Sequence, residues 1–157
     1  VVLILITFIS YTWDDTQDDI TRRLEVNELK HLARGMSDAL VMTSGAPHFW
    51  ATSPNNATAI GLAQLPLQIS EARWTAFASL NYEKQKEKLG VGRFEFWVAI
   101  KSTSGATLNS TGSEPTGDYR IGLSRAVTYN DEPCFLNFIL WEDYMTNAIP
   151  AGGYWGV

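Results

Sequence analysis

The first thirteen residues form an almost unbroken apolar run, and no other feature constrains the fold as strongly. Val1 to Trp13 contains no charged side chain, and it is followed by four acids, Asp14, Asp15, Asp18 and Asp19. Apolar residues then recur every three to five positions, at Ile20, Leu24, Leu29, Leu32, Met36 and Leu40. This spacing keeps them on one face of a helix. We therefore predict one long helix over residues 1–44, apolar at its start and amphipathic afterwards.

The two halves of this helix require different surroundings. A surface that is apolar all round must be buried in lipid or in other protein, whereas an apolar stripe needs cover on one side only. The run of thirteen residues is shorter than the ~20 that cross a bilayer. Either further apolar residues precede Val1 or the run packs in a protein core, and we favour an incomplete or processed N-terminus. The rest of the chain would cover the second half of the helix.

Turn and capping residues divide that remainder. Gly45 suits the position just past a helix end. Ser70 is a plausible N-cap for a second helix over residues 71–89, which Gly90 closes. The apolar residues within this second helix are imperfectly spaced, so a break near Asn81 is an open alternative.

Three stretches have the pattern of strands. Residues 93–101 have apolar side chains at every second position, as in a strand. Four of these side chains should face the core: Phe94, Phe96, Val98 and Ile100. Residues 102–117 are rich in Ser, Thr and Gly and are expected to form an exposed loop. Residues 119–129 form a second extended stretch. After a turn at residues 130–133, residues 134–141 are apolar on both faces, which indicates the middle strand or a strand covered on both sides.

These elements predict an α+β fold in two parts. The N-terminal helix spans residues 1–44, and residues 45–157 form a globular head. The head would be a small antiparallel sheet of three or four strands with the second helix. Its apolar face would pack on the first helix through Ile20, Leu24, Leu29, Leu32, Met36 and Leu40.

Charge and cysteine content narrow the function. The net charge is −5, with only 12 Lys and Arg residues spread along the chain. Binding to nucleic acid rewards clustered positive charge, so we expect no nucleic-acid partner. The one cysteine, Cys134, lies in an apolar stretch and cannot form an internal disulfide, so it is expected to be a buried thiol.

The sequence offers little to an enzyme. Ser124 could be paired with His48 or His31 as nucleophile and base, but there is no Gly-x-Ser-x-Gly elbow. No Gly-rich phosphate loop and no Cys/His metal spacing is present. We therefore predict no catalytic residue, no resident metal and no cofactor.

The four acids after the apolar run carry two interpretations. Asp14 and Asp18 share one helix face, as do Asp15 and Asp19, and such oxygens suit calcium. The favoured interpretation is a solvated belt where the helix leaves its apolar surroundings.

Two sequons suggest surface modification. Asn56-Ala57-Thr58 and Asn109-Ser110-Thr111 match the acceptor pattern for N-linked glycans, which makes Asn56 and Asn109 possible glycosylation sites.

Several local stretches, taken in their order along the chain, resemble archaeal type IV pilin-like proteins exported by class III signal peptides. They are Thr43 to Trp50, Ala59 to Ala63, Leu80 to Val91, Phe94 to Phe96, and Arg125 to Tyr129 with Leu136 to Trp141. The resemblance covers most of the chain. It implies a type IV pilin-like fold and assembly into an extracellular filament, with helices bundled inside and heads outside.

The first functional hypothesis is therefore a pilin, a structural subunit of a cell-surface filament that serves adhesion. The membrane would hold the subunit before it joins a homopolymer. Ten residues would form the filament core: Val1, Val2, Leu3, Ile4, Leu5, Ile6, Phe8, Ile9, Tyr11 and Trp13. The alternative is a membrane-anchored extracytoplasmic domain that does not polymerise and binds a ligand through the loop at residues 48–50 or the tail at Tyr154 and Trp155.

Overall fold

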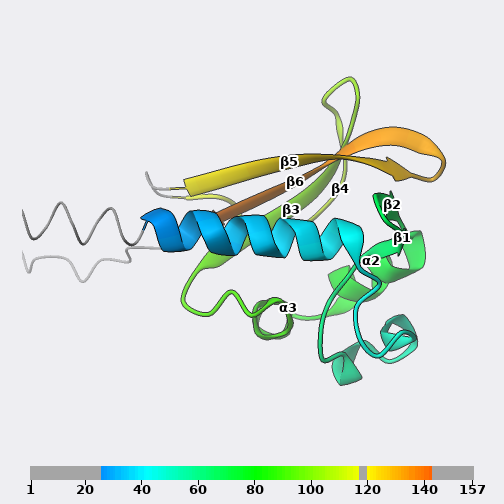
Figure 1. The fold of residues 1–157 in the computed structure, drawn as a ribbon, viewed down its shortest axis with the longest axis horizontal. Coiled ribbons are helices and arrows are strands. Elements are labelled where there is room, and N and C mark those ends of the chain that lie inside the picture. The colour runs from blue at the N-terminus through cyan, green and yellow to red at the C-terminus, as the bar shows by residue number, and fades with distance from the viewer. Residues whose placement is uncertain (1–25, 117–119, 143–157) are drawn as a thin grey trace, which may run out of the picture.

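A six-stranded sheet frames the structure, a computed structural model that describes residues 26–116 and 120–142. Its strand order is β1-β2-β5-β6-β3-β4. The first helix covers residues 26–42 and runs alongside the strands (Figure 1). The other elements are η1 (Trp50–Thr52), η2 (Pro54–Asn56), β1 (Ala63–Leu65), β2 (Gln68–Ile69), α2 (Glu71–Ser79), α3 (Tyr82–Leu89), β3 (Glu95–Ser102), β4 (Thr107–Gly112), β5 (Arg120–Tyr129) and β6 (Glu132–Trp141).

The long hairpin of β5 and β6 is the centre of the sheet. Asn130 and Asp131 both have positive φ, 51° and 63°, as a two-residue hairpin turn requires. β6 pairs antiparallel with β5 on one side and with β3 on the other. This confirms the prediction that residues 134–141 lie in a middle strand.

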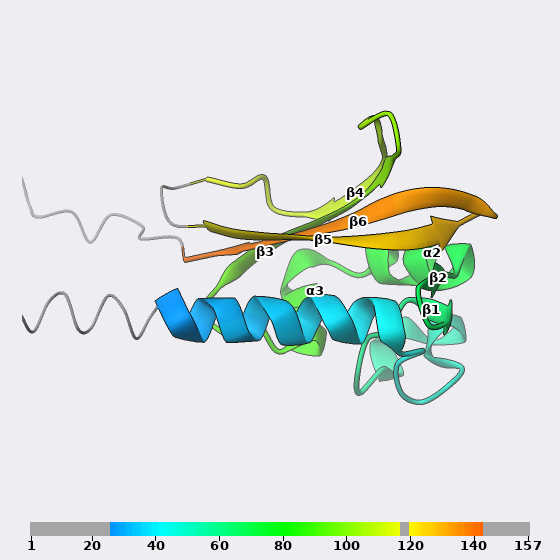
Figure 2. The same ribbon diagram turned by 45° about the horizontal axis from the view of Figure 1, so that its top comes forward.

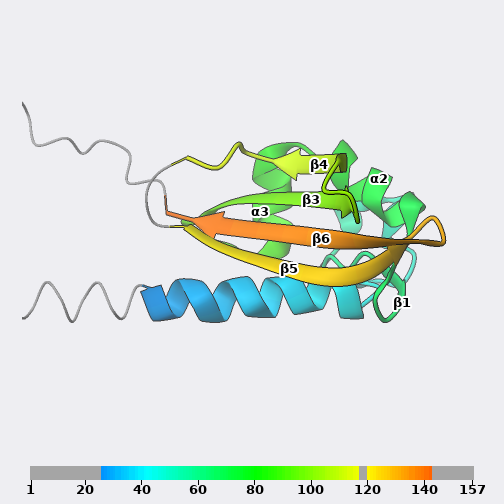
Figure 3. The same ribbon diagram turned by 90° about the horizontal axis from the view of Figure 1, so that it is seen from above.

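The described helices all lie on one face of the sheet, as Figures 2 and 3 show. That face carries the buried side chains of β3 and β6: Phe96, Val98, Ile100, Leu136, Phe138 and Leu140. Trp74 and Phe77 of α2 and Leu29, Ala33 and Leu40 of the first helix belong to the same core. The predicted core positions Phe94, Phe96, Val98 and Ile100 are confirmed as buried.

The predicted fold class, with its small antiparallel sheet of pilin type, was wrong. The sheet has six strands, and it is mixed because β2 runs parallel to β5. β4 lies within the stretch that was expected to be a loop. Most of its residues are polar and it forms the sheet edge, so no buried alternating pattern reveals it. β1 and β2 have three and two residues, too few for any periodicity.

The helices also differ from prediction. Residues 1–25 of the predicted long helix lie outside the described residues, and the described helix ends at residue 42 rather than 44. The single second helix is two helices, so the break near Asn81 is confirmed. The Lys84 backbone N–H donates to Asn81 Oδ1 over 2.9 Å, which makes Asn81 the N-cap of α3. Gly90 closes α3 in the left-handed region, as expected.

The segment at residues 61–67 completes the end of the first helix. The final carbonyls of a helix lack partners within it. Here the backbone N–H groups of Leu62 and Leu67 donate to the carbonyls of Leu40 and Val41, over 2.9 and 2.7 Å. The carbonyl of Leu67 in turn accepts from the Thr128 N–H of β5 over 2.8 Å. One short segment therefore fastens the helix end to the sheet.

This arrangement predicts opposite effects for two Gly→Ala substitutions. A Cβ on Gly61 would lie 2.3 Å from the Thr43 carbonyl oxygen, whereas a Cβ on Gly35, within the helix, meets nothing within 4 Å. We expect Gly61→Ala to lower the free energy of unfolding by about 1–3 kcal/mol. Gly35→Ala should raise it by roughly 0.5–1 kcal/mol. Urea unfolding of both variants measures the difference, and a Gly61→Ala variant as stable as the parent would contradict the close approach.

Candidate functional site

The candidate functional site is the interface between the first helix, residues 26–42, and the sheet. Ala33 and Ser37 lie one turn apart on the helix and are fully buried. Their small side chains allow the helix to lie close to the core. The Ser37 hydroxyl has no hydrogen-bond partner among the described residues, which is costly in a dry interior.

The residues predicted to pack the helix on the head have different positions. Leu29 and Leu40 are buried in the core, and Leu32 and Met36 are partly buried against it. Ile20 and Leu24 lie outside the described residues.

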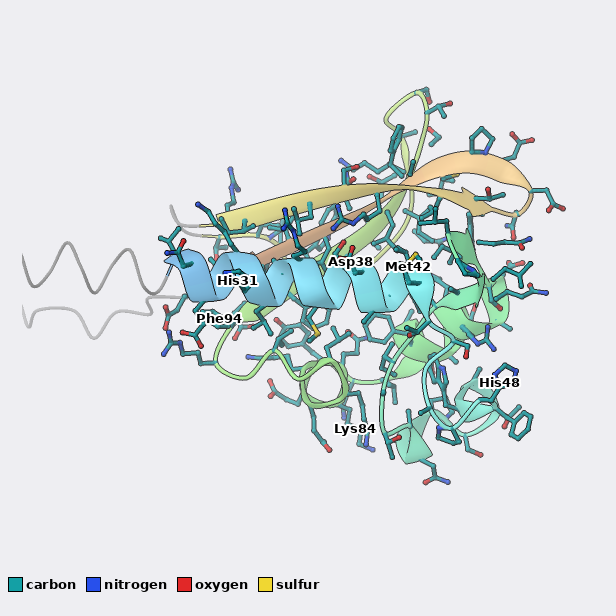
Figure 4. All side chains as sticks on the ribbon, viewed as in Figure 1. His31, Asp38, Met42, His48, Lys84 and Phe94 are labelled. Atoms are coloured by element: carbon teal, nitrogen blue, oxygen red, sulfur yellow. The ribbon has the colours of Figure 1, made fainter. Side chains whose placement is uncertain are left out.

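Charged side chains flank this interface. Asp38, on the edge of the helix next to β5 (Figure 4), lies 2.7 Å from a terminal guanidinium nitrogen of Arg125. Near the helix start, Arg93 pairs with Glu28 over 3.2 Å and with Glu142, after β6, over 3.0 Å. Exposed pairs of this kind contribute little stability each. Their directional contacts hold the helix in register with the sheet.

We call the end of the head formed by Glu28, Arg93 and Glu142 the neck. The Arg93 guanidinium also lies 4.9 Å over the ring of the buried Phe94. The described part of the first helix begins at this end, and β6 also ends here (Figures 1 and 3). The neck therefore links the start of the described helix to the residue that follows β6.

Exposed apolar side chains come from elements at the other end of the head. These elements are the end of the first helix, the loop after it, the β1–β2 hairpin, and the starts of β4 and β6 (Figure 1). The large exposed hydrophobic residues of the described chain are Met42, Phe49, Leu65, Leu67, Leu108 and Phe135. The head therefore has two chemically different ends.

A partly buried polar cluster joins α3 to β3. The Tyr82 hydroxyl donates to Glu95, and Lys86 Nζ lies 2.5 Å from Glu95 Oε1. Burial, and then the hydrogen bond to Glu95, raise the pKa of Tyr82. Burial alone would raise the pKa of Glu95, but the hydrogen bonds from Lys86 and Tyr82 outweigh it, so the pKa of Glu95 is lowered. The cluster therefore links α3 to β3.

A depression of about 380 Å³ lies beside this cluster. It opens to solvent and is lined by Glu83, Lys86, Glu87, Gly90 and Gly92. Sites for small molecules are usually enclosed and mostly apolar. A charged, open depression of this kind does not have that character.

The structure does not bring the residues considered for catalysis together. His31 and His48 lie toward different ends of the first helix (Figure 4), and both are exposed. His48 Nδ1 lies 3.3 Å from Ser44 Oγ. Ser124 is exposed on β5, paired across the ladder with Asn137. Within residues 26–116 and 120–142, no three His, Cys, Asp or Glu side chains gather to hold a metal ion.

The structure describes some of the other predicted residues and not the rest. Cys134 is buried as expected, and burial raises the pKa of its thiol. Asn56 is exposed at the end of η2, whereas Asn109 is half-buried in β4. The ten residues of the predicted filament core, the four acids at residues 14–19, and the tail residues Tyr154 and Trp155 lie outside the described residues.

No family model, curated protein or solved structure matches the chain. Among the described residues, no helix is long and apolar enough to cross a membrane.

Sequence reasoning missed the residues that fasten the interface. Two signals were available. Arg125 interrupts the inward-facing alternation of its strand, which suggests a partner across the interface. Ala33 and Ser37 are small residues at one-turn spacing within the apolar stripe, which suggests close packing. No comparable pattern distinguishes Arg93 from the other exposed cations.

The buried hydroxyl of Ser37 generates one prediction. Ser37→Ala removes an unpartnered polar group and keeps the volume small, so the free energy of unfolding should rise by about 1 kcal/mol. Ser37→Leu should lower it by about 1–3 kcal/mol because the interface has no room. Thermal unfolding of both variants measures this, and equal stability of the two would refute the close contact.

The Glu95 cluster generates a prediction about pH. The pKa of Glu95 is lowered in the folded state, against about 4.3 in the unfolded chain. Its stabilisation is therefore complete above about pH 4.3 and is lost as the pH falls through the lowered value. Glu95→Gln removes this titrating group, so the free energy of unfolding of the variant should fall less steeply than that of the parent as the pH drops from about 5 to about 2.

Tyr82→Phe is the matched control, because it removes one donor to Glu95 and keeps the ring and Lys86. It should flatten the same curve only in part. Urea unfolding across the pH series measures both variants. A Glu95→Gln curve with the parent slope would show that the carboxylate is not held in this way.

Proposed function

We propose that the chain is a structural subunit of an extracellular filament, and that it polymerises through its apolar N-terminal residues. Two observations together support the proposal. Val1 to Trp13 is an uncharged apolar run, and the first helix already packs its apolar stripe on the sheet of the same chain. That interface is therefore already covered without the run. The run therefore needs another apolar environment.

Energetics favour assembly as that environment. Burial of one aliphatic side chain stabilises by about 1.5–3 kcal/mol, and the run contains many such side chains. Before assembly the membrane would shelter them, and afterwards the same residues of other copies would do so. Contacts between different surfaces that do not close into a ring produce open helical polymers.

The neck gives such a polymer a defined geometry. Arg93 joins Glu28 of the first helix to Glu142 after β6. Arg125 joins the helix to β5 through Asp38. Each copy would therefore present its head in the same orientation relative to its N-terminal segment, as a helical filament requires. The resemblance to archaeal pilin-like proteins supports the same function and suggests adhesion as its use.

A second candidate is a membrane-anchored domain that binds a ligand without polymerising. The observation in its favour is Phe49, which is 72% exposed and stands edge-on to His48 with ring centroids 5.5 Å apart. Trp50, the third aromatic residue of that loop, is buried and its indole N–H donates to the Ser44 carbonyl over 2.7 Å. Only two of the three side chains can therefore meet a ligand.

Electron microscopy of the full chain and two variants separates these candidates. Ile4→Glu places a charge in the apolar run, and an unpaired buried charge costs several kcal/mol per subunit. We expect filaments from the parent and none from Ile4→Glu at the same protein concentration. Leu65→Glu, at an exposed position of the head, is the matched control and should still give filaments.

Circular dichroism should show a folded head in both variants, so that loss of filaments is not loss of folding. Filaments from Ile4→Glu as abundant as those of the parent would refute polymerisation through the run. Dispersed, detergent-dependent particles from the parent would favour the anchored domain.

A further inference from the structure

The two sequons occupy different environments. Asn56 is exposed at the end of η2, in the loop that follows the first helix. This loop is fastened on both sides of Asn56. Lys84 of α3 donates to the side-chain oxygen of Asn55 over 2.6 Å, and Ala57 is buried in the core. The Thr58 hydroxyl of the same sequon donates to the Ala46 carbonyl over 3.1 Å, but it does so at an exposed position and bonds to no buried side chain. The Asn56 side chain is therefore presented at the surface by a well-anchored loop.

Asn109 lies in β4, and its amide belongs to the structure of the sheet edge. Its Nδ2 donates to the Tyr129 hydroxyl of β5 over 3.0 Å. The ring of Tyr129 is buried. A saccharide on Nδ2 would have to displace this contact on the side of the sheet that the helices cover.

The second recognition group of this sequon is also engaged. Thr111 Oγ1 lies 2.9 Å from Nε2 and 3.2 Å from Oε1 of Gln85. Gln85 is itself buried, and its Nε2 donates to the carbonyls of Phe77 and Leu80 over 3.0 Å each. Buried polar groups are costly to leave without partners. Exposing Thr111 to an enzyme would therefore disrupt the junction of α2, α3 and β4.

We propose that Asn56 is an acceptor for an N-linked saccharide and that Asn109 is a structural amide that the folded chain does not offer. The donor is a saccharide linked through phosphate to a lipid. Nδ2 of Asn56 forms a bond to the anomeric carbon, the bond from that carbon to the phosphate oxygen breaks, and the amide loses one proton. The lipid-linked phosphate is the leaving group.

This inference rests on the proposed function, because export brings the chain to the enzymes that transfer such saccharides. It also fits the geometry of that function. The loop with η1 and η2 lies beyond the end of the first helix, away from the neck (Figures 1 and 2). A saccharide on Asn56 would extend from the head without meeting the segment that is buried on assembly.

The test is glycopeptide mass spectrometry of the folded full chain. The chain is incubated with membranes that contain an oligosaccharyltransferase and its lipid-linked saccharide. The enzyme is one first shown to modify two unfolded peptides, residues 50–62 and 104–116, equally well. We expect the folded chain to be modified at Asn56 at least tenfold more than at Asn109. Comparable modification of Asn109, or an unmodified Asn56, would overturn the inference.

Two variants confirm the assignment. Thr58→Ala destroys the first sequon without changing Asn56 and should abolish the modification, whereas Thr111→Ala should leave it unchanged. A second readout is stability without any saccharide. Asn109→Ala should lower the midpoint of urea unfolding because Tyr129 loses its donor, and Asn56→Ala should not. Equal midpoints would contradict the structural role of Asn109.

The outcome is separable from that of the proposed function. If an Asn56→Gln variant without saccharide forms filaments, polymerisation does not depend on the modification. Glycopeptide mass spectrometry of the folded chain then decides separately whether Asn56 is the acceptor. Conversely, modification at Asn56 in a chain that never polymerises would support the acceptor and refute the filament.

Discussion

The close contact between the first helix and the sheet is the constraint on which the rest of the head depends. Ala33 and Ser37 bring the helix near the core, and this proximity allows the Leu67 backbone to bond to both the helix end and β5. Leu67 has a φ of 65°, which is uncommon for a residue other than glycine. The bonds on both sides of it hold that conformation. They also explain why β2 runs parallel to β5, because the chain must turn back along the helix end before it reaches the sheet edge.

Stability and orientation come from different interactions in this interface. Burial of Leu29, Leu40 and the facing residues of β3 and β6 supplies the free energy, since apolar area removed from water is the largest favourable contribution. The pairs of Arg93 and Arg125 are partly exposed and contribute little each. Apolar contact is not directional, however, and it permits a helix to slide or rotate. The ion pairs specify one register among arrangements that bury similar areas.

Sequence reasoning recovered the elements with strong local signals and missed those defined by partners elsewhere. The alternation at Phe94 to Ile100 predicted β3, and the capping residues Ser70 and Gly90 predicted the start of α2 and the end of α3. The break near Asn81 was left open, on imperfect apolar spacing alone. β4 was missed because most of its residues are polar and its stability comes from pairing with β3. The parallel pairing of β2 depends on Leu67, a contact that no local pattern encodes. The fastening residues Arg93 and Arg125 have partners more than sixty positions away.

The same distinction applies to the two sequons, which are identical in pattern and different in chemistry. A motif of three residues reports only that an amide and a hydroxyl are near each other in the chain. Whether they can react depends on what else they bond to once the chain has folded. At Asn109 and Thr111 the partners are Tyr129 and Gln85, brought near from β5 and α3. At Asn56 the neighbouring residues Asn55 and Ala57 bear the contacts with α3 and the core, and the Thr58 hydroxyl makes one hydrogen bond, to a backbone carbonyl, at an exposed position. The fold thus leaves the amide between them exposed to solvent.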